Sequence, residues 1–431
     1  MLTEILETIF ILLSLLMSAY LVRHYLFTLV ILKKPIRGEH DPAITGVNYQ
    51  PSVSILIPAR DEERVIGRIL KRMTELSYPK DKLQVIVIDD GSADATGKVA
   101  RYYSERYDYI HLVQRSWNEG RRGKASVLNF GMRQAKGEII LCFDADYYPQ
   151  KDIVEKLVKV FADPKVGAVQ GRVVVLNEPK NLVTRIVALE RIGGYRIDQE
   201  ARDRLGLITQ YGGTVGGFRR ELIESFGGFD ENMLAEDTDL TLRIYLAGYR
   251  VKYEVDAQCY EEAVDSWKAY WKQRKRWSMG HMQCAFKYSL KIVKSKKLKL
   301  SEKIDGLLML NVYFMPIIMI ASWIIGVSLF LLESSKWVPI FWPATLLFMY
   351  SSFGNFAPFY EVAAGAYLDG RGRAYWLTPL LIITSLYNVL ICTKALLDLL
   401  VSKLRKSAYP WDKTEHKGDG NYYIMINASN Q

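Results

Sequence analysis

The chain has 431 residues, of which 49% are hydrophobic and 24% are charged, and its formal net charge is +10. This length accommodates one large folded domain together with membrane segments. The basic residues gather beside apolar stretches, which favours anionic lipid headgroups and nucleotide diphosphates as partners and disfavours a nucleic-acid-binding protein. The four cysteines show neither zinc-ligand spacing nor a disulfide-like pattern. They predict reduced, mostly packed thiols in a cytoplasmic domain.

The first segment is apolar and long enough to cross a bilayer. Residues 5–32 carry few charges, and the basic residues Lys33, Lys34 and Arg37 follow them. The stretch is longer than the apolar region of a signal peptide, and no basic region precedes it. It predicts an uncleaved transmembrane anchor. The basic residues at its end place the next domain in the cytoplasm by the positive-inside rule.

From Pro51 onward, short apolar runs alternate with charged helical stretches. Four buried strands are expected at residues 53–58, 84–89, 110–115 and 138–143, with helices at residues 62–76 and 94–106. This alternation predicts an α/β domain with an open, mainly parallel sheet that helices cover on both faces. Ligands bind such sheets beyond the carboxyl ends of the strands. Functional residues are therefore expected at those strand ends.

Asp89 and Asp90 follow directly on the second expected strand, in VIDDGSAD. Such a pair can hold a ribose and a uracil edge, while Gly91 lets the backbone approach the ligand closely. A tight strand-to-helix turn that uses Asp and Ser as a cap explains the same residues equally well. The motif alone leaves both interpretations open.

Asp144 and Asp146 follow the fourth expected strand, in CFDADYYP. Carboxylates at i and i+2 on an extended segment can reach a divalent cation and its diphosphate oxygens, and hard oxygen ligands suit Mg²⁺ or Mn²⁺. The other interpretation is an acidic loop exposed to water. Because a fully apolar strand precedes both carboxylates, the metal site is favoured.

Glu236 and Asp237 begin a helix in LAEDTDLTLRIYLAGY. Carboxylates in a first helical turn are ordinary partners of the helix dipole. A carboxylate near a sugar donor can also act as the base that takes a proton from an attacking hydroxyl. The choice between the two depends on the other motifs.

Two glycine-bounded stretches give weaker signals. Arg121, Arg122 and Lys124 precede a helix in NEGRRGKASVLNFG, where they could clamp a diphosphate or form a solvated basic turn. Residues 212–220, GGTVGGFRR, predict a flexible loop that could approach a sugar closely.

Gln273, Arg276 and Trp277 stand at i, i+3 and i+4 in YWKQRKRWSMGH, so a helix places all three on one face. Arginine can bind a diphosphate through two hydrogen bonds, and tryptophan can stack on a sugar ring. Taken alone, the stretch is better explained as a basic amphipathic helix lying on a membrane. The three acidic motifs that precede it shift the interpretation toward a donor site.

Apolar character returns after residue 307. Segments at residues 308–332, 338–360 and 377–401 are each long enough to span a bilayer, and prolines and glycines interrupt them. Such interruptions suit helices that line a shared interior or channel. Two basic stretches are predicted to be cytoplasmic, namely Arg371 with Arg373 and the group Lys403, Arg405 and Lys406. These predictions conflict if all three segments cross fully, so one segment is re-entrant or interfacial, or the tail is external.

The ordered set of motifs resembles glycosyltransferase family 2. SILIPARDEE, VIDDGSAD, GKASVLN, FDADYYP, GGFRRE, LAEDTDL and QRKRW occur in the order seen in that family, over about residues 52–280. The membrane-embedded branch is the most similar; it includes cellulose, hyaluronan, chitin-oligosaccharide and poly-N-acetylglucosamine synthases. The resemblance implies a cytoplasmic GT-A-like α/β domain of Rossmann type combined with transmembrane α-helices, and an inverting transfer from a nucleotide sugar.

The resemblance also implies residue roles. Asp237 would be the general base, with Glu236 beside it as a second catalytic residue. Asp144 and Asp146 would bind Mg²⁺ or Mn²⁺ and the diphosphate, and Gln273, Arg276 and Trp277 would bind the donor diphosphate and the acceptor sugar. The nucleotide-sugar-binding residues would be Pro58, Arg60, Glu62, Asp89, Asp90, Lys124, Asp144 and Ala145. Ala235 replaces a threonine that often precedes the ED pair in cellulose synthases, which leaves donor and acceptor preference open.

The expected organisation is that of a multi-pass plasma-membrane protein. It has an anchor at residues 1–37, a GT-A domain at 50–264, amphipathic interface helices at 265–306, a transmembrane region at 307–402 and a tail at 403–431. The tail contains YPWDKTEHKG, which resembles an ending of several relatives and carries no assigned chemistry.

The leading hypothesis is a processive synthase that extends a β-linked polysaccharide from UDP-N-acetylglucosamine or UDP-glucose and passes it through its own helices. The alternative is a non-processive transferase that glycosylates a lipid acceptor. A membrane-bound nucleotide-sugar sensor is disfavoured because Asp144, Asp146, Asp237 and QRKRW are all intact. The expected partners are a UDP-sugar, a glycan or lipid acceptor and the bilayer, without nucleic acid; the sequence specifies no secretion partner.

Overall fold

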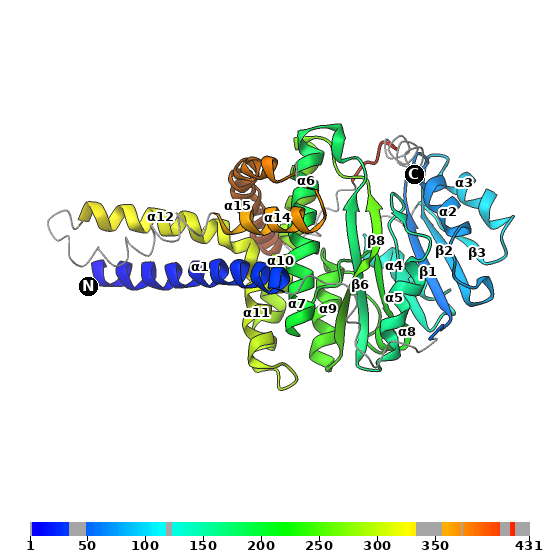
Figure 1. Ribbon diagram of the computed structural model, residues 1–431, viewed down its shortest axis with the longest axis horizontal. Coiled ribbons are helices and arrows are strands. Elements are labelled where there is room, and N and C mark those ends of the chain that lie inside the picture. Colours follow the sequence, from blue (N-terminus) through cyan, green and yellow to red (C-terminus); the bar gives the residue numbers. More distant parts are fainter. Residues whose placement is uncertain are drawn as a thin grey trace.

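The computed structural model describes residues 2–33, 49–117, 123–332, 356–371, 374–405 and 414–418. An eight-stranded sheet with the order β3-β2-β1-β4-β7-β6-β8-β5 forms its centre. Helices pack on both sides of the sheet, and two long helices project away from it (Figure 1). The α/β domain combined with apolar helices is therefore confirmed.

The first half of the sheet is parallel, as predicted. Its strands are β1 (Val53–Ala59), β2 (Leu83–Asp90), β3 (Ile110–Arg115) and β4 (Ile139–Cys142). β1 pairs in parallel with both β2 and β4, and β2 pairs in parallel with β3. β1, β2 and β4 are almost wholly buried because each packs a core on either face, whereas β3 is the partly exposed edge strand. In β1, Ile55 and Ile57 enter one core and Leu56 enters the other.

The second half of the sheet is mixed and was not predicted. Its strands are β5 (Tyr148–Pro149), β6 (Val166–Val175), β7 (Gly216–Arg219) and β8 (Arg250–Glu261). β6 and β8 are parallel, whereas β7 runs antiparallel to both β4 and β6, and β5 runs antiparallel to β8. The expected loop at residues 212–220 is thus only partly a loop, since its second glycine pair begins the central strand β7.

Short helices connect the strands of the domain. They are α2 (Ile66–Thr74), α3 (Thr96–Ser104), α4 (Lys124–Met132), α5 (Ile153–Val158), α6 (Leu182–Arg191), α7 (Glu200–Leu205), α8 (Arg220–Ser225) and α9 (Glu236–Ala247), with 3-10 turns η1 (Lys80–Lys82), η2 (Lys159–Ala162) and η3 (Glu178–Lys180). The helix expected at residues 62–76 begins only at Ile66. The preceding residues form a turn instead, in which the Glu62 backbone N–H donates to Thr96 Oγ1 at 2.7 Å.

The helix that carries QRKRW packs directly on the domain. It is α10 (Trp267–Lys294), and α11 (Leu300–Asn311) follows it. Cys284, Tyr288 and Ile292 of α10 belong to the same buried core as Leu56 of β1. Residues 265–306, which were predicted to form amphipathic interface helices, thus contribute to the hydrophobic core on one face of the sheet.

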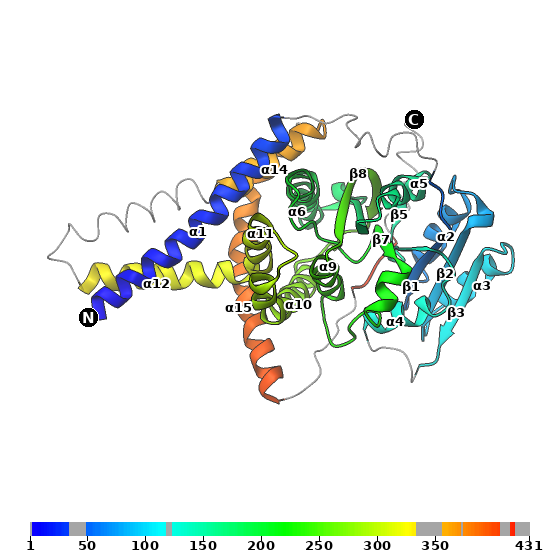
Figure 2. The ribbon, with the colours of Figure 1, turned by 90° about the horizontal axis from the view of Figure 1, so that it is seen from below.

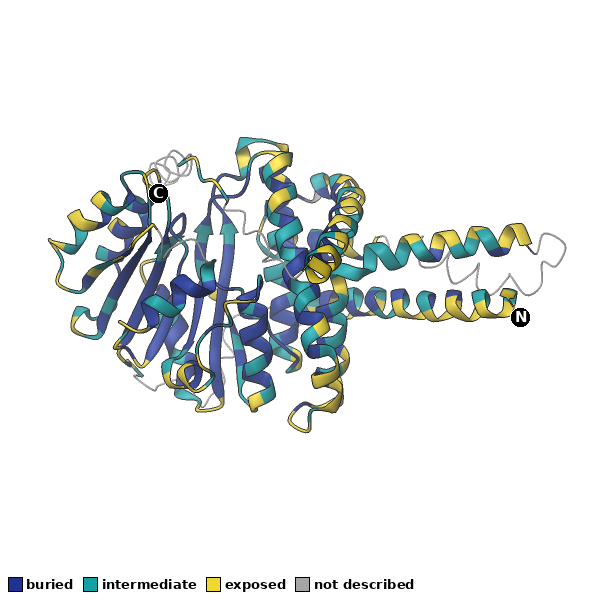
Figure 3. Ribbon diagram, turned by 180° about the vertical axis from the view of Figure 1, so that it is seen from behind, coloured by how far each residue is buried: buried dark blue, intermediate teal, exposed yellow. Residues whose placement is uncertain are grey.

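Three helical stretches are long and apolar enough to cross a membrane: Leu2–Lys33, Leu300–Leu332 and Trp376–Arg405. The first stretch is α1 (Leu2–Lys33). The second consists of α11, η5 (Val312–Phe314) and α12 (Met315–Leu332). The third consists of part of η7 (Ala374–Leu380) and α15 (Leu381–Arg405), and α14 (Ala357–Leu368) precedes η7. α1 and α12 project together and expose much of their surface (Figures 1 and 3). The expected segment at residues 338–360 lies mostly outside the described residues.

The helix α15 runs across the base of the projecting pair rather than alongside it (Figures 1 and 2). It packs against α10, where Cys392 and Leu399 join Met282 in a small core. Residues 414–418 beyond it pack against the α/β domain, where the backbone N–H groups of Lys417 and Gly418 donate to Glu262 Oε1. An interfacial or re-entrant segment and an external tail both stay predictions about the membrane.

A buried ion-pair network joins α1 to the domain. Arg23 of α1 donates to Asp305 of α11 at 2.7 Å and to Asp198 at 2.6 Å. Arg202 pairs with the same Asp198 at 2.8 Å. Since removing one partner of a buried pair leaves an uncompensated charge, this network fixes the position of the projecting helix relative to the domain.

The cysteine prediction is confirmed. Cys142, Cys259, Cys284 and Cys392 are all free and buried.

Gly217 offers a test of the unpredicted half of the sheet. A Cβ at this position would lie 2.0 Å from the Ile140 carbonyl oxygen of β4, so Gly217→Ala must force the strands apart. We expect a loss of about 2 kcal/mol or more in stability, seen as a lower midpoint of thermal unfolding in detergent. Gly194→Ala is the control, because no atom lies within 4 Å of its added Cβ. Equal midpoints for the two variants would contradict the strand placement.

Candidate active site

A cavity of about 450 Å³ lies where the strand ends of β1, β2 and β4 meet α9 and α10. The structure brings almost every predicted site residue to its wall. These residues are Pro58, Arg60, Glu62, Asp90, Lys124, Asp144, Ala145, Asp146, Glu236, Asp237, Gln273, Arg276 and Trp277. They come from segments more than 200 residues apart, so the arrangement is a property of the fold.

Asp89 is the exception, because it does not line the cavity. Its carboxylate accepts hydrogen bonds from the Ser92 backbone N–H at 3.1 Å and from Gln114 Nε2 at 2.9 Å. The capped turn thus accounts for Asp89, whereas Asp90 faces the cavity and lies 3.3 Å from Arg115 Nε. Asp89 therefore fits the interpretation as a capped turn, and Asp90 fits the interpretation as a ligand-binding residue.

Lys124 and Asp144 form an ion pair in the cavity wall. Lys124 is the first residue of α4, and its Nζ lies 2.6 Å from Asp144 Oδ1. Burial disfavours the charge on Lys124, but Asp144 and Glu236 outweigh burial and raise the pKa of the lysine. The ammonium group therefore stays charged between two acidic motifs. Arg121 and Arg122 lie outside the described residues.

Asp146 is more deeply buried than Asp144. Its Oδ2 accepts a hydrogen bond from the Glu262 backbone N–H at 3.3 Å. Burial, supported by the nearby carboxylates of Asp144 and Glu62 and opposed by His416, raises the pKa of Asp146 to about 6. Bringing a cation to this side chain would favour its ionised form.

The C-terminal tail enters the cavity, a contact that the sequence did not predict. His416 Nδ1 lies 3.0 Å from Glu62 Oε2, and its Nε2 lies 3.7 Å from Asp146 Oδ2. Burial opposes the charge on His416, but Asp146 and Glu62 outweigh it and raise its pKa to about 9. The backbone N–H groups of Lys417 and Gly418 donate to Glu262 Oε1 at 2.9 and 3.0 Å. The tail thus supplies one imidazolium and two backbone donors to an acidic wall.

Glu236 and Asp237 begin α9, as predicted, and they differ in environment. Glu236 is buried, and burial raises its pKa, with Asp237 adding to the effect and Lys124 opposing it. Asp237 is only partly buried. The loop beside it comes close because Gly213 has a φ of +76°, and a Cβ on Gly213 would lie 3.2 Å from Asp237 Oδ2. Asp237 is therefore the more accessible of the two carboxylates.

The predicted helical face of α10 is confirmed, since Gln273, Arg276 and Trp277 all line the cavity. The Trp277 indole ring is held by two guanidinium groups, at 4.2 Å from Arg274 and 5.1 Å from Arg191. Glu261 in turn fixes Arg191 through two hydrogen bonds at 2.5 and 2.9 Å. The purely membrane-surface interpretation of this stretch is therefore wrong.

The donor set for a divalent metal is partial. Asp144 and Asp146 both offer hard oxygen ligands to the cavity, which suits Mg²⁺ or Mn²⁺. Among the described residues, however, no group of three or more His, Cys, Asp or Glu side chains could hold a metal ion. Because Mg²⁺ commonly keeps water and substrate phosphates as ligands, the two carboxylates fit a metal shared with a diphosphate.

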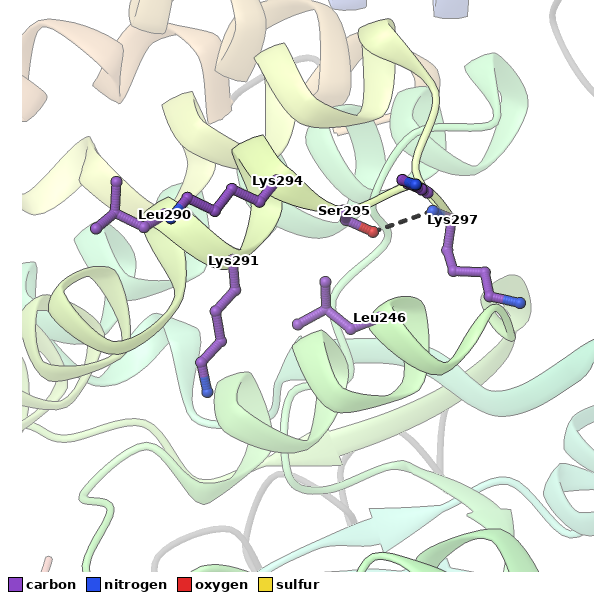
Figure 4. A pocket seen from close by; sticks show the side chains of 7 residues that line it. Leu246, Leu290, Lys291, Lys294, Ser295 and Lys297 are labelled. Carbon is purple, nitrogen blue, oxygen red and sulfur yellow. Dashed lines mark hydrogen bonds between the residues drawn. The ribbon is translucent and has the colours of Figure 1, made fainter.

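A second depression lies between the ends of α9 and α10 and differs in chemistry. Leu246, Leu290, Lys291, Lys294, Ser295, Lys296 and Lys297 line it (Figure 4). Its ionisable lining side chains are all lysines, so it has no carboxylate that could act as a base. The acidic cavity is therefore the candidate active site.

Comparison with known proteins agrees with this site. Residues 51–280, more than half of the chain, match the family model described as glycosyltransferase like family 2. The probable glycosyltransferase YdaM of Bacillus subtilis is 40% identical over 248 residues, 57% of this chain and 59% of that protein. The β-monoglucosyldiacylglycerol synthase of Synechocystis sp. is 34% identical over 257 residues, 58% and 53% of the two chains. The poly-β-1,6-N-acetyl-D-glucosamine synthase of Staphylococcus aureus is 28% identical over 256 residues, 59% and 60%.

The match thus spans little more than half of the length of each of these relatives. Among solved structures, the mannosyltransferase PcManGT of Pyrobaculum calidifontis, in complex with GDP-Man and Mn²⁺, has a TM-score of 0.56 and 26% identity, and the alignment covers 84% of this chain and 98% of that one. The matched residues 51–280 contain both acidic strand ends, the start of α9 and QRKRW, so the comparison and the cavity rest on the same part of the chain. The chain therefore belongs to glycosyltransferase family 2 and has a GT-A-like fold.

Proposed function

We propose that the protein transfers a sugar from a nucleoside diphosphate sugar to a hydroxyl group of a membrane lipid, with inversion at the anomeric carbon. The observation that carries the proposal is the placement of Asp237, Lys124, Asp144 and Arg276 around one cavity. A base, two cationic groups and a metal-binding carboxylate are what an inverting transfer from a diphosphate donor requires. The proposal includes the predicted residue roles, except that Asp89 acts by holding the turn that presents Asp90.

Asp237 acts as the base in this scheme. Its carboxylate takes the proton of the acceptor hydroxyl, and the resulting oxygen attacks the anomeric carbon from the face opposite the diphosphate. The bond between that carbon and the diphosphate oxygen breaks in the same displacement, so an α-linked donor gives a β-linked product. Asp237 suits this role better than Glu236 because it is less buried and stands beside the close loop at Gly213.

Cationic groups neutralise the diphosphate as it departs. Lys124 is held charged at the cavity wall by Asp144 and Glu236, and Arg276 lines the same cavity from α10. Preorganised charges of this kind stabilise a developing negative charge more effectively than water does. A divalent cation bound by Asp144 and Asp146 would supply further positive charge to the diphosphate.

The lipid acceptor is favoured by the surroundings of the cavity. Tyr313 lines it, and α12 begins two residues later, at Met315. Asp198 and Arg202 line it as well, and both belong to the ion-pair network of α1. The cavity wall is therefore built at the base of the two projecting apolar helices. The relative from Synechocystis is a glycolipid synthase by name, which agrees with such an acceptor.

A processive polysaccharide synthase is the second candidate, supported by the 28% identity to a poly-N-acetylglucosamine synthase. It is ranked second because a translocated chain needs helices that enclose a passage. Among the described helices, 22% of the apolar window of α1 and 17% of that of α11–α12 is buried, and α15 runs across rather than along them. For either candidate we propose that α1 and α12 anchor the protein in a membrane and that the catalytic domain faces the cytoplasm. The length and apolar composition of these helices support this proposal.

A donor panel on the full chain in detergent tests the proposed function. We expect release of nucleoside diphosphate from one of UDP-glucose, UDP-N-acetylglucosamine or GDP-mannose when a diacylglycerol or another lipid acceptor is present, with a product that partitions into organic solvent. A high-molecular-weight aqueous product would establish the polysaccharide synthase instead. If no donor released nucleoside diphosphate, the proposed transfer would be contradicted.

Asp237→Asn removes the proposed base but keeps the size of the side chain. We expect turnover to fall by about a hundredfold or more, because a positioned base contributes at least that factor. Donor affinity should change little, since Asp237 acts on the acceptor. The matched control is Asp256→Asn on β8, where the aspartate is exposed. Turnover that is equally high in both variants would exclude Asp237 as the base.

Metal removal tests the roles of Asp144 and Asp146. We expect EDTA to abolish transfer and added Mn²⁺ or Mg²⁺ to restore it, since the carboxylates of Asp144 and Asp146 would repel a diphosphate unless a cation lies between them. Asp146→Asn should raise the Mn²⁺ concentration needed for half-maximal activity by about tenfold, which corresponds to about 1.4 kcal/mol. Activity that is indifferent to EDTA would contradict the metal role while leaving the base intact.

A further inference from the structure

The cavity contains a group of residues that the donor chemistry does not use. His281 of α10 and Tyr313 of η5 both line the cavity, and their rings pack at a centroid distance of 4.7 Å. His281 stands four residues after Trp277 on the same helix, so it extends the face of Gln273 and Trp277 toward the base of α12. The motif QRKRW ends before His281, so no motif in the sequence singles this residue out.

His281 has unused hydrogen-bonding capacity. Its Nδ1 is buried without a partner, and within the described part of the chain neither ring nitrogen has a hydrogen bond. Buried polar groups are nearly always paired in proteins, and an exception at a cavity wall indicates a place for a ligand. Within the described residues no side chain satisfies the imidazole, so a ligand in the cavity is the partner that the geometry offers.

The protonation of His281 defines the ligand chemistry. Burial lowers the pKa of His281, Asp237 opposes this shift and Arg202 adds to it. A neutral imidazole offers one donor and one acceptor, which matches a hydroxyl group and suits neither a phosphate nor an ammonium ion specifically. The same interactions show that His281 lies within the electrostatic reach of both the proposed base and the α1 network.

We propose that His281, supported by Tyr313, forms the acceptor subsite and hydrogen-bonds a hydroxyl of a membrane lipid headgroup next to Asp237. The inference rests on the proposed function and adds the residues that recognise its acceptor. A lipid is the occupant because Tyr313 precedes the apolar helix α12 by two residues and the network on the other side ends on α1. A headgroup held there keeps its acyl chains beside the two projecting helices.

The test uses the full chain with its acceptor lipid and separates acceptor binding from donor binding. His281→Phe keeps a ring that can pack on Tyr313 but removes both hydrogen-bonding atoms. We expect the KM for the lipid acceptor to rise by about tenfold, as for a lost hydrogen bond that leaves polar groups unpaired. The donor dissociation constant, measured without acceptor, should stay within about twofold. His281→Gln retains a donor and an acceptor and should restore most of the acceptor affinity.

A control variant and the possible outcomes separate this inference from the proposed function. His111→Phe makes the same substitution at an exposed residue of β3 and should leave both constants unchanged. The subsite would be overturned if His281→Phe left the acceptor KM unchanged, or if it changed the donor and acceptor constants in parallel. Neither result would contradict the transferase activity. An aqueous polysaccharide product would overturn the lipid acceptor. An inactive native protein would remove the proposed function and the subsite together.

Discussion

The concentration of carboxylates around one cavity is the constraint on which the rest of the site depends. Asp90, Asp144, Asp146, Glu236 and Asp237 share its wall with Glu62, Glu261 and Glu262. Like charges at such distances raise one another's pKa values and destabilise the folded state unless cations offset them. Lys124 and His416 offset part of this charge, and a metal with an arginine would offset more when a diphosphate is bound. The acidic wall therefore favours cationic partners.

The half of the fold that carries local signals could be predicted, and the other half could not. β1, β2 and β4 are mainly apolar runs with turn residues at their ends, which is the pattern of buried parallel strands. β7 is four residues long and contains Gly216 and Gly217, which have poor strand propensity. Only the close approach of Ile140 and Val169 explains those glycines, and that approach exists only once the sheet has formed. The turn before α2 similarly depends on Thr96, which lies more than 30 residues away.

The same division applies to the site. For residues at strand ends or on one helical face, such as Asp144 and Trp277, the spacing predicted where they would lie, because a periodic backbone fixes their direction. The family resemblance, and not the spacing, suggested their roles. His281 and His416 could not be found, since each gains its position from a contact made across the chain. The sequence suggested that Asp89 and Asp90 both contact the ligand, but only Asp90 lines the cavity. Adjacent residues on a strand point to opposite sides, so the two side chains cannot both face it.

Both ends of the described chain contact charged residues of the cavity wall. Arg23 of α1 reaches Asp198, and Asp198 lines the cavity beside the acceptor residues. His416 of the tail reaches Asp146, which lines the cavity at the donor side. Because both contacts are between charged groups and partly buried, each is sensitive to what occupies the cavity between them. In the proposed reaction, a donor diphosphate would bring negative charge to the side of Asp146 and His416, whereas an acceptor hydroxyl at His281 would be neutral. The proposed function therefore implies that donor binding acts on the tail and that acceptor binding acts on the network of α1.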